Sequence, residues 1–161
     1  ILEKFYTVTP KYELGAVLAA PDNSNISAVL AIGDEALILK QHKVYPHEID
    51  LGKIWFDRTL LPFVFAVWAV RRNFCRSHPE IVREIHRELL RCRQEGGHDL
   101  KSISERVGPR VSMTAAACYK YLRGIEYDFS RPKKLGLARF IEYLIERGEG
   151  EKEALPLKIF S

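Results

Sequence analysis

The chain has 161 residues and a formal net charge of +4, and 47% of its side chains are hydrophobic. This apolar content excludes disorder as the main state, because disordered chains are poor in such residues. The length predicts one domain or two small ones. The longest apolar run extends from Leu60 to Val70 and contains Pro62, so it is too short to cross a membrane as a helix, which takes about 20 residues.

The chain begins at Ile1, and its only methionine is Met113. The opening letters, ILEKFY, predict the second half of an amphipathic helix without a capping residue before it. We therefore expect a fragment of a longer protein. Removal of a leader peptide is the alternative, although no signal pattern opens the chain.

The three cysteines, Cys75, Cys92 and Cys118, are too far apart for a zinc or redox motif. Their odd number, without a signal pattern, favours free thiols in a reducing cytoplasm. The five histidines include no HExxH or HxH pair, so the sequence predicts no metal site.

The first half of the chain predicts short elements separated by loops. We expect a helix end over 1–6 and a short strand over 12–17. The PDNSN segment at 21–25 is rich in residues that favour turns and predicts a loop. Residues 26–32 form a short apolar run of the kind found in a buried strand.

Two helices are expected next. The apolar run stops at Gly33-Asp34, and a short helix from Glu35 should follow. Asp50 is placed to cap a second helix that runs to about Thr59.

Residues 61–72, LPFVFAVWAVRR, predict a strand that is buried on both faces. Nearly every side chain is apolar, so polar and apolar residues do not alternate. Burial of its large side chains contributes roughly 8–15 kcal/mol, comparable with the net stability of a whole domain, about 5–15 kcal/mol. We therefore expect other elements to cover it. Alone, the chain should aggregate, pair with a second polypeptide or exchange elements with itself. The large side chains are Phe63, Val64, Phe65, Val67 and Trp68.

The rest of the chain is predicted to be largely helical. Pro79 should open a helix that ends at Gly96-Gly97. Basic side chains in this helix lie three and four residues from acidic ones, which predicts a solvated face. Two shorter helices are expected over about 99–107 and 112–123.

The last elements complete the expected layout. IEYDF at 125–129 alternates and predicts an edge strand, Pro132 opens a final helix, and the charged tail at 149–161 should be loose. Strands that alternate with helices give an α/β fold class. Ligands of open α/β sheets bind at the carboxyl ends of strands, which favours two turns, Gly33-Asp34 and 59–62.

Four stretches of the chain resemble one family. They are AIGDEAL at 31–37, DLGKIWFDRTLLPFVFAVWAVRR at 50–72, PDNSN and YLRGIEYDF. The chain is similar over most of its length to the chorismate dehydratase family of menaquinone biosynthesis, which serves the futalosine route. That family commonly has glycine where Leu60 stands, and leucine has less backbone freedom at such a turn.

The resemblance implies a two-lobed fold similar to periplasmic binding proteins, here lacking its N-terminal part. Residues 1–60 would be the later part of the second lobe, and 61–148 a mostly helical contribution to the first lobe. The implied enzyme is a cytoplasmic lyase that removes water from chorismate to give 3-[(1-carboxyvinyl)oxy]benzoate. The resemblance implies no cofactor, nucleic acid or membrane. A missing N-terminal part or a second chain would complete the fold.

Four residues are the candidates for substrate binding. Gly33 lets the backbone approach a ligand, and Asp34 would orient amides or a substrate hydroxyl, or else cap a helix. Thr59 would donate to a substrate carboxylate, or else simply end a helix. Phe63 and Phe65 would either contact the substrate ring or pack in the core. No residue of the chain is assigned as the catalytic base.

Two other functions remain open at this stage. A solute-binding protein of the same fold would have the cleft without the reaction, because architecture does not fix activity. Residues 99–123 also imitate a helix-turn-helix. Its second helix opens with Ser112, Met113, Thr114 and three alanines, and lacks the Arg, Asn or Gln that read base edges.

Overall fold

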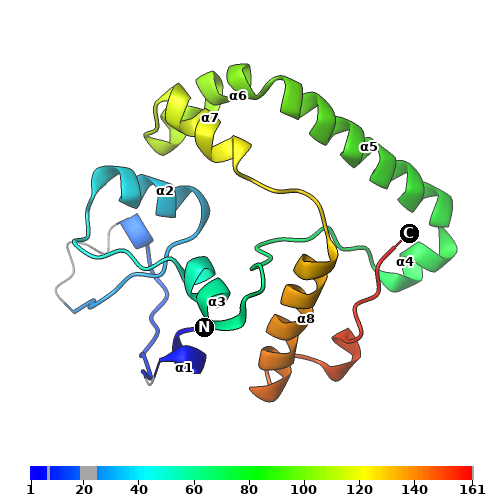
Figure 1. The fold of residues 1–161 in the computed structure, drawn as a ribbon, viewed down its shortest axis with the longest axis horizontal. Coiled ribbons are helices and arrows are strands. Elements are labelled where there is room, and N and C mark those ends of the chain that lie inside the picture. Colours follow the sequence, from blue (N-terminus) through cyan, green and yellow to red (C-terminus); the bar gives the residue numbers. More distant parts are fainter. Residues whose placement is uncertain (7, 19–24, 161) are drawn as a thin grey trace. The chain divides into compact units, whose positions relative to one another are not determined.

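The computed structural model describes residues 1–6, 8–18 and 25–160, and in these ranges it consists of helices joined by irregular segments (Figure 1). The described chain is mostly helical, as expected for its second half. The α-helices are α1 (Leu2–Phe5), α2 (Gly33–His42), α3 (Leu51–Thr59), α4 (Arg72–Ser77), α5 (Pro79–His98), α6 (Leu100–Val107), α7 (Ala115–Arg123) and α8 (Arg131–Glu146). Short 3₁₀ helices include η2 (Gly108–Val111) and η3 (Lys152–Ala154).

Local sequence signals place the helix starts. The Asp50 carboxylate accepts a hydrogen bond of 3.0 Å from the Lys53 N–H, which confirms the predicted cap of α3. Pro79 and Pro132 lie in the first turns of α5 and α8, where a missing N–H costs nothing. α7 begins three residues later than predicted because Thr114 caps it, by accepting from the Ala117 N–H at 3.2 Å.

The predicted strands were wrong for the residues that the structure describes. The segments 12–17, 26–32, 61–72 and 125–129 contain no strand. Two of the side chains expected to be buried there are exposed: Leu30 by 65% and Trp68 by 86%. A strand requires a ladder of hydrogen bonds with a neighbouring strand, and the described residues of these segments form no such ladder. Of the predicted loop at 21–25, residues 21–24 lie outside the described ranges.

The described residues divide into two compact units whose segments alternate along the chain. Unit 1 contains Ile1–Lys11, Ile49–Trp68 and Tyr127–Ser161, and unit 2 contains Tyr12–Glu48 and Ala69–Glu126. The chain therefore passes between the units four times. The two predicted lobes refer to a larger fold and stay a prediction.

The core of unit 1 is a cluster of aromatic rings around Trp55. The Trp55 side chain is fully buried and makes edge-to-face contacts with four rings, at centroid distances between 5.7 and 6.3 Å. Such pairs add about 0.5–1.5 kcal/mol each to the burial of apolar area. The four rings are Phe5 on α1, Phe63 after α3, and Phe140 and Tyr143 on α8.

Polar contacts and one close approach complete this packing. Lys4 pairs with Glu146 at 2.7 Å, and Glu3 pairs with Arg147, so α1 is tied to the end of α8. On the same helix, a Cβ at Gly136 would lie 2.1 Å from the Pro62 carbonyl oxygen. Only glycine allows the segment after α3 to lie this close to α8.

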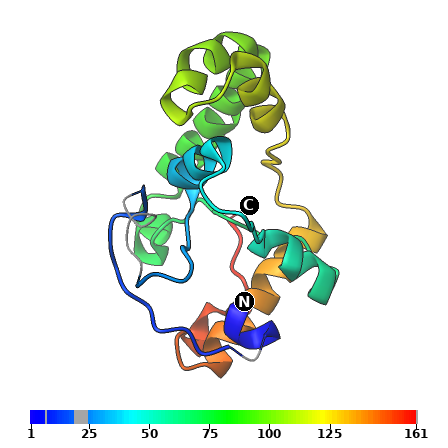
Figure 2. The same ribbon diagram turned by 90° about the vertical axis from the view of Figure 1, so that its left-hand side faces the viewer.

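Most buried residues of unit 2 lie where α6, η2 and α7 pack together (Figures 1 and 2), and Val82 of α5 is also buried. Cys118 of α7 and Val111 of η2 are buried. Ser104 of α6 is also buried, and its hydroxyl donates to the Leu100 carbonyl at 2.6 Å. Cys118 is thus a core residue with a free thiol.

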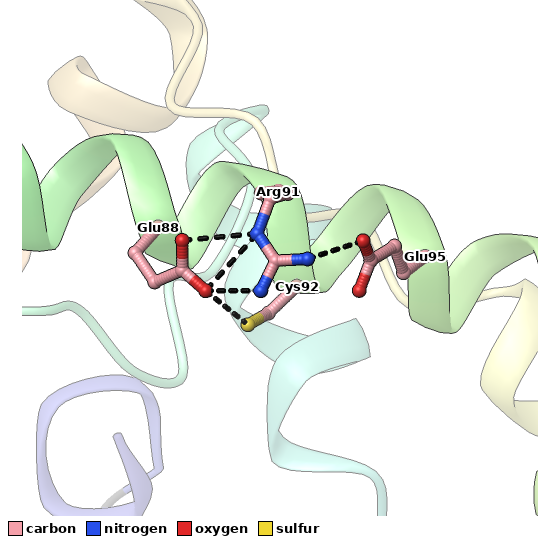
Figure 3. A network of polar contacts seen from close by, with 4 residues as sticks. All are labelled: Glu88, Arg91, Cys92 and Glu95. Atoms are coloured by element: carbon pink, nitrogen blue, oxygen red, sulfur yellow. Dashed lines mark hydrogen bonds and ion pairs between the residues drawn. The ribbon is translucent and has the colours of Figure 1, made fainter.

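The charged face of α5 is solvated, which confirms that prediction. Arg91 reaches both Glu88, at 2.9 and 3.0 Å, and Glu95, and the Cys92 sulfur lies 3.8 Å from the Glu88 carboxylate (Figure 3). The hydrogen bond from Arg91 holds the pKa of Glu88 below its usual value. These exposed pairs, one turn apart, support the helix itself.

No helix in the described ranges is both long enough and apolar enough to cross a bilayer.

Substitution of the two tryptophans tests which of their side chains is buried and which is exposed. Trp55→Ala should lower the free energy of unfolding by about 3–5 kcal/mol, because it removes the centre of the ring cluster. Trp68→Asp should change it by less than about 0.5 kcal/mol, as for other exposed positions. Urea titration followed by circular dichroism measures both. A large loss of stability in Trp68→Asp would contradict the exposed position of that side chain.

Candidate functional site

Gly33 is the first residue of α2 and has a φ of +64°, a left-handed conformation that favours glycine. The residue before it, Ile32, occupies the N-cap position, and no side chain caps the helix. Asp34 lies in the first helical turn and is exposed. The alternative prediction, that Asp34 is the helix cap, is therefore not seen.

The Asp34 carboxylate makes no hydrogen bond or ion pair within the described part of the chain. It shares the first turn of α2 with Glu35, and the partial positive charge of the helix N-terminus favours both carboxylates. Two carboxylates at this end oppose a bound anion. The end of α2 therefore suits a ligand group that donates a hydrogen bond, such as a hydroxyl, better than a ligand carboxylate.

The Thr59 side chain closes the end of α3. Its hydroxyl donates to the Trp55 carbonyl at 2.7 Å and accepts from the Leu61 N–H at 3.2 Å. A hydroxyl has one proton to donate, and here that proton is used within the helix. In this conformation Thr59 has no proton to offer a ligand carboxylate, and the interpretation of Thr59 as a helix-terminal residue accounts for its geometry.

Leu60 follows with a φ of +58°, in the left-handed region, and its N–H donates to the Phe56 carbonyl at 2.8 Å. Its side chain is 77% exposed. This is the helix-ending position that glycine usually occupies, which gives a physical reason for the glycine of the resembling family. Leucine is strained there because its Cβ crowds the following carbonyl.

Phe63 belongs to the aromatic cluster of unit 1. Its ring lies 5.7 Å from Trp55, 5.2 Å from Phe140 and 5.0 Å from Phe65, measured between centroids. Phe65 is 72% exposed. Of the two aromatic candidates, Phe63 therefore has the surroundings of a packing residue, and Phe65 offers a free ring face.

The four candidates fall into two pairs. Gly33 and Asp34 belong to unit 2, and Thr59 and Phe63 belong to unit 1. Two open surface pockets, of about 740 and 620 Å³, are lined by other residues, over 69–74 and on α2 and α7. In the described ranges, no group of three or more His, Cys, Asp or Glu side chains is arranged to hold a metal ion.

Sequence reasoning missed the residues that position the turn at 59–62. Trp55 accepts the hydrogen bond of Thr59, and Gly136 admits the Pro62 carbonyl. The signal for Trp55 was available, because it is the largest side chain of a helix with a clear apolar face. Gly136 carried no signal, because a close approach between distant segments is a tertiary property.

Leu60→Gly should raise the free energy of unfolding by about 0.5–1 kcal/mol, because it relieves left-handed strain at the cost of some unfolded-state entropy. Lys43→Gly is the matched control, since Lys43 ends α2 with a φ of +51°. Thermal unfolding should show a similar rise in Tm for both variants. A rise for Lys43→Gly together with a fall for Leu60→Gly would mean that the leucine side chain makes stabilising contacts.

Comparison with known proteins places the chain in a family. The family model described as menaquinone biosynthesis matches residues 1–146. The chorismate dehydratase of Thermus thermophilus is 34% identical over 136 residues. The match covers 75% of this chain and 48% of that protein, so the chain spans about half the length of its curated relative. No solved structure matches the chain. The chain belongs to the menaquinone biosynthesis family.

Proposed function

We propose that this chain forms part of a chorismate dehydratase, a lyase that breaks a carbon–oxygen bond. The observation that carries the proposal is the 34% identity to a curated chorismate dehydratase, within a family whose model covers residues 1–146. The substrate is then chorismate, a dicarboxylate, and the product is 3-[(1-carboxyvinyl)oxy]benzoate. The futalosine route and a cytoplasmic location belong to this proposal.

The proposed architecture is the two-lobed α/β fold that resembles periplasmic binding proteins. In it, residues 1–60 form the later part of the second lobe, residues 61–148 contribute to the first lobe, and 149–161 form a tail. Polypeptide outside this chain, whether a further part of the same protein or a second chain, would complete the sheet. The exposure of Phe65 and Trp68 supports this proposal, because large apolar side chains are usually covered in a finished fold.

The reaction needs acid–base chemistry without an obligatory cofactor. A C–H proton leaves the ring, the C–O bond to the ring hydroxyl breaks, and the electron pair of the C–H bond completes the aromatic ring. The departing hydroxide takes up one proton, which balances the proton lost from the ring, and leaves as water. A group that gives a proton to the hydroxyl and one that accepts the ring proton would each assist the reaction, and a group that orients the hydroxyl would assist binding.

Of the residues in this chain, Asp34 has the properties suited to holding the hydroxyl. Its carboxylate is exposed and lies at a helix start where Gly33 keeps the backbone open, with nothing within 4 Å of the position that a Cβ of residue 33 would take. We assign Asp34 as acceptor of a hydrogen bond from the substrate hydroxyl. In unit 1, Phe65 is proposed as a contact for a ligand ring, because its ring is exposed whereas that of Phe63 is packed against Trp55 and Phe140. The base is not assigned to this chain.

The test is conversion of chorismate by the full-length protein that contains this chain, followed by chromatography and mass spectrometry of a product lighter by one water. Asp34→Asn should lower kcat/KM by about 10- to 100-fold, the loss expected for a hydrogen bond to a charged group. Glu35→Gln, on the same exposed helical turn, is the control and should stay close to the unsubstituted protein.

Absence of product, together with absence of any chorismate-dependent rise in Tm, would contradict the proposed function. Equal loss of activity in Asp34→Asn and Glu35→Gln would contradict the role of Asp34 alone, because it would indicate a general charge effect at the start of α2.

A further inference from the structure

Three arginine side chains lie close together in the sequence at α4, and each is exposed to solvent. Arg71 directly precedes the helix, Arg72 begins it and Arg76 lies in its last turn. Within the described part of the chain, none of the three makes a hydrogen bond or an ion pair. By contrast, Arg91 on α5 has two glutamate partners one turn away.

This arrangement of charge is unfavourable for the helix itself. Arg72 and Arg76 are four residues apart on one helix face, where like charges repel. The partial positive charge at the start of a helix opposes a cation, and Arg71 and Arg72 both lie there. From Arg58 to Pro79 the sequence contains no Asp or Glu that would offset the charge. Charge that opposes the fold without compensation is typical of a functional site, here one for an anion.

A pocket of about 740 Å³ opens at the same arginines. Its volume lies within the range of about 300–1,000 Å³ that is usual for small-molecule sites. Phe74 stacks on His78, with 4.8 Å between the ring centroids, and is 40% exposed, so its ring is held in place and still faces solvent. The wall therefore combines apolar side chains with guanidinium and amide donors. The lining residues are Ala69, Val70, Arg71, Arg72, Asn73 and Phe74, all of unit 2.

The charge and the size of this pocket favour a phosphate monoester with a flat organic group. A phosphate monoester carries a charge of about −1.5 to −2 at pH 7 and has three strong acceptor oxygens, whereas a single carboxylate has one charge and two oxygens. Guanidinium groups bind phosphate through paired N–H···O bonds. The Phe74 ring offers the organic group an apolar contact. A nucleic acid would need basic side chains spread along a longer surface.

We propose that Arg71, Arg72 and Arg76 form a second ligand site, which binds a phosphate monoester with a flat organic group. This site goes beyond the proposed function, because none of its residues is assigned to chorismate or to the loss of water. Binding of a phosphate probe and conversion of chorismate are separate measurements, so either can fail without the other.

Isothermal titration calorimetry of the full-length protein that contains this chain, with phenyl phosphate as the probe, tests the site. Arg72→Gln should weaken binding by about 10- to 100-fold, because it removes a charged donor to the phosphate. Arg72→Lys keeps the charge but loses the paired donors, so its affinity should lie between the two. Arg93→Gln is the matched control and should bind as the unsubstituted protein does. Arg93 is an exposed arginine of α5 outside the pocket.

Further probes test the ligand chemistry and the independence of the site. Inorganic phosphate should bind more weakly than phenyl phosphate because it lacks the ring. Benzoate should also bind more weakly, because it has the ring but only one negative charge. Arg72→Gln should leave the chorismate-dependent rise in Tm unchanged.

Four results would overturn the inference. The first is no binding of phenyl phosphate, and the second is equal weakening in Arg72→Gln and Arg93→Gln, which would indicate a general charge effect. The third is benzoate binding as tight as that of phenyl phosphate, which would make the ligand a carboxylate. The fourth is loss of the chorismate-dependent rise in Tm in Arg72→Gln, which would make these arginines part of the substrate site.

Discussion

The burial of one indole ring organises unit 1. Trp55 is fully buried, and the rings around it come from α1, from the segment after α3 and from α8. These elements are far apart in the sequence and have few other contacts that hold them together. The ion pairs between α1 and the end of α8 are exposed, and exposed pairs contribute little. The ring cluster is therefore the main buried contact among these elements.

The same cluster explains the contrast within the segment after α3. Phe63 packs against Trp55 and Phe140, whereas Trp68, five residues later, is 86% exposed. Apolar composition is uniform across this stretch, so burial is decided by what lies beside each residue. The stretch begins inside the ring cluster and ends in an exposed apolar surface.

Helices were predictable from this sequence because their signals are local. Asp50 and the two prolines that open α5 and α8 act within one turn of their own helix. Strands were not predictable, because an apolar run such as 26–32 becomes a strand only when a neighbour accepts its hydrogen bonds. The estimated free energy of burying the side chains of 61–72 was misleading for Trp68. A large gain from burial does not mean that another part of the chain covers the side chain.

The candidate site was predictable in part. A glycine before a helix pointed to Gly33, and its positive φ gives that choice a physical reason. The role of Thr59 was not predictable, since its hydroxyl is used by the Trp55 carbonyl, a contact that the sequence does not show. The backbone strain at Leu60 was not predictable either. It follows from the positive φ of Leu60, which depends on how α3 ends.

The central proposal is that Asp34, at the start of α2, contacts chorismate. Backbone amide chemical shifts during titration with chorismate test it most directly. The account predicts that amides over 33–35 shift and saturate with a single Kd. Unchanged shifts of these amides throughout the titration would contradict it.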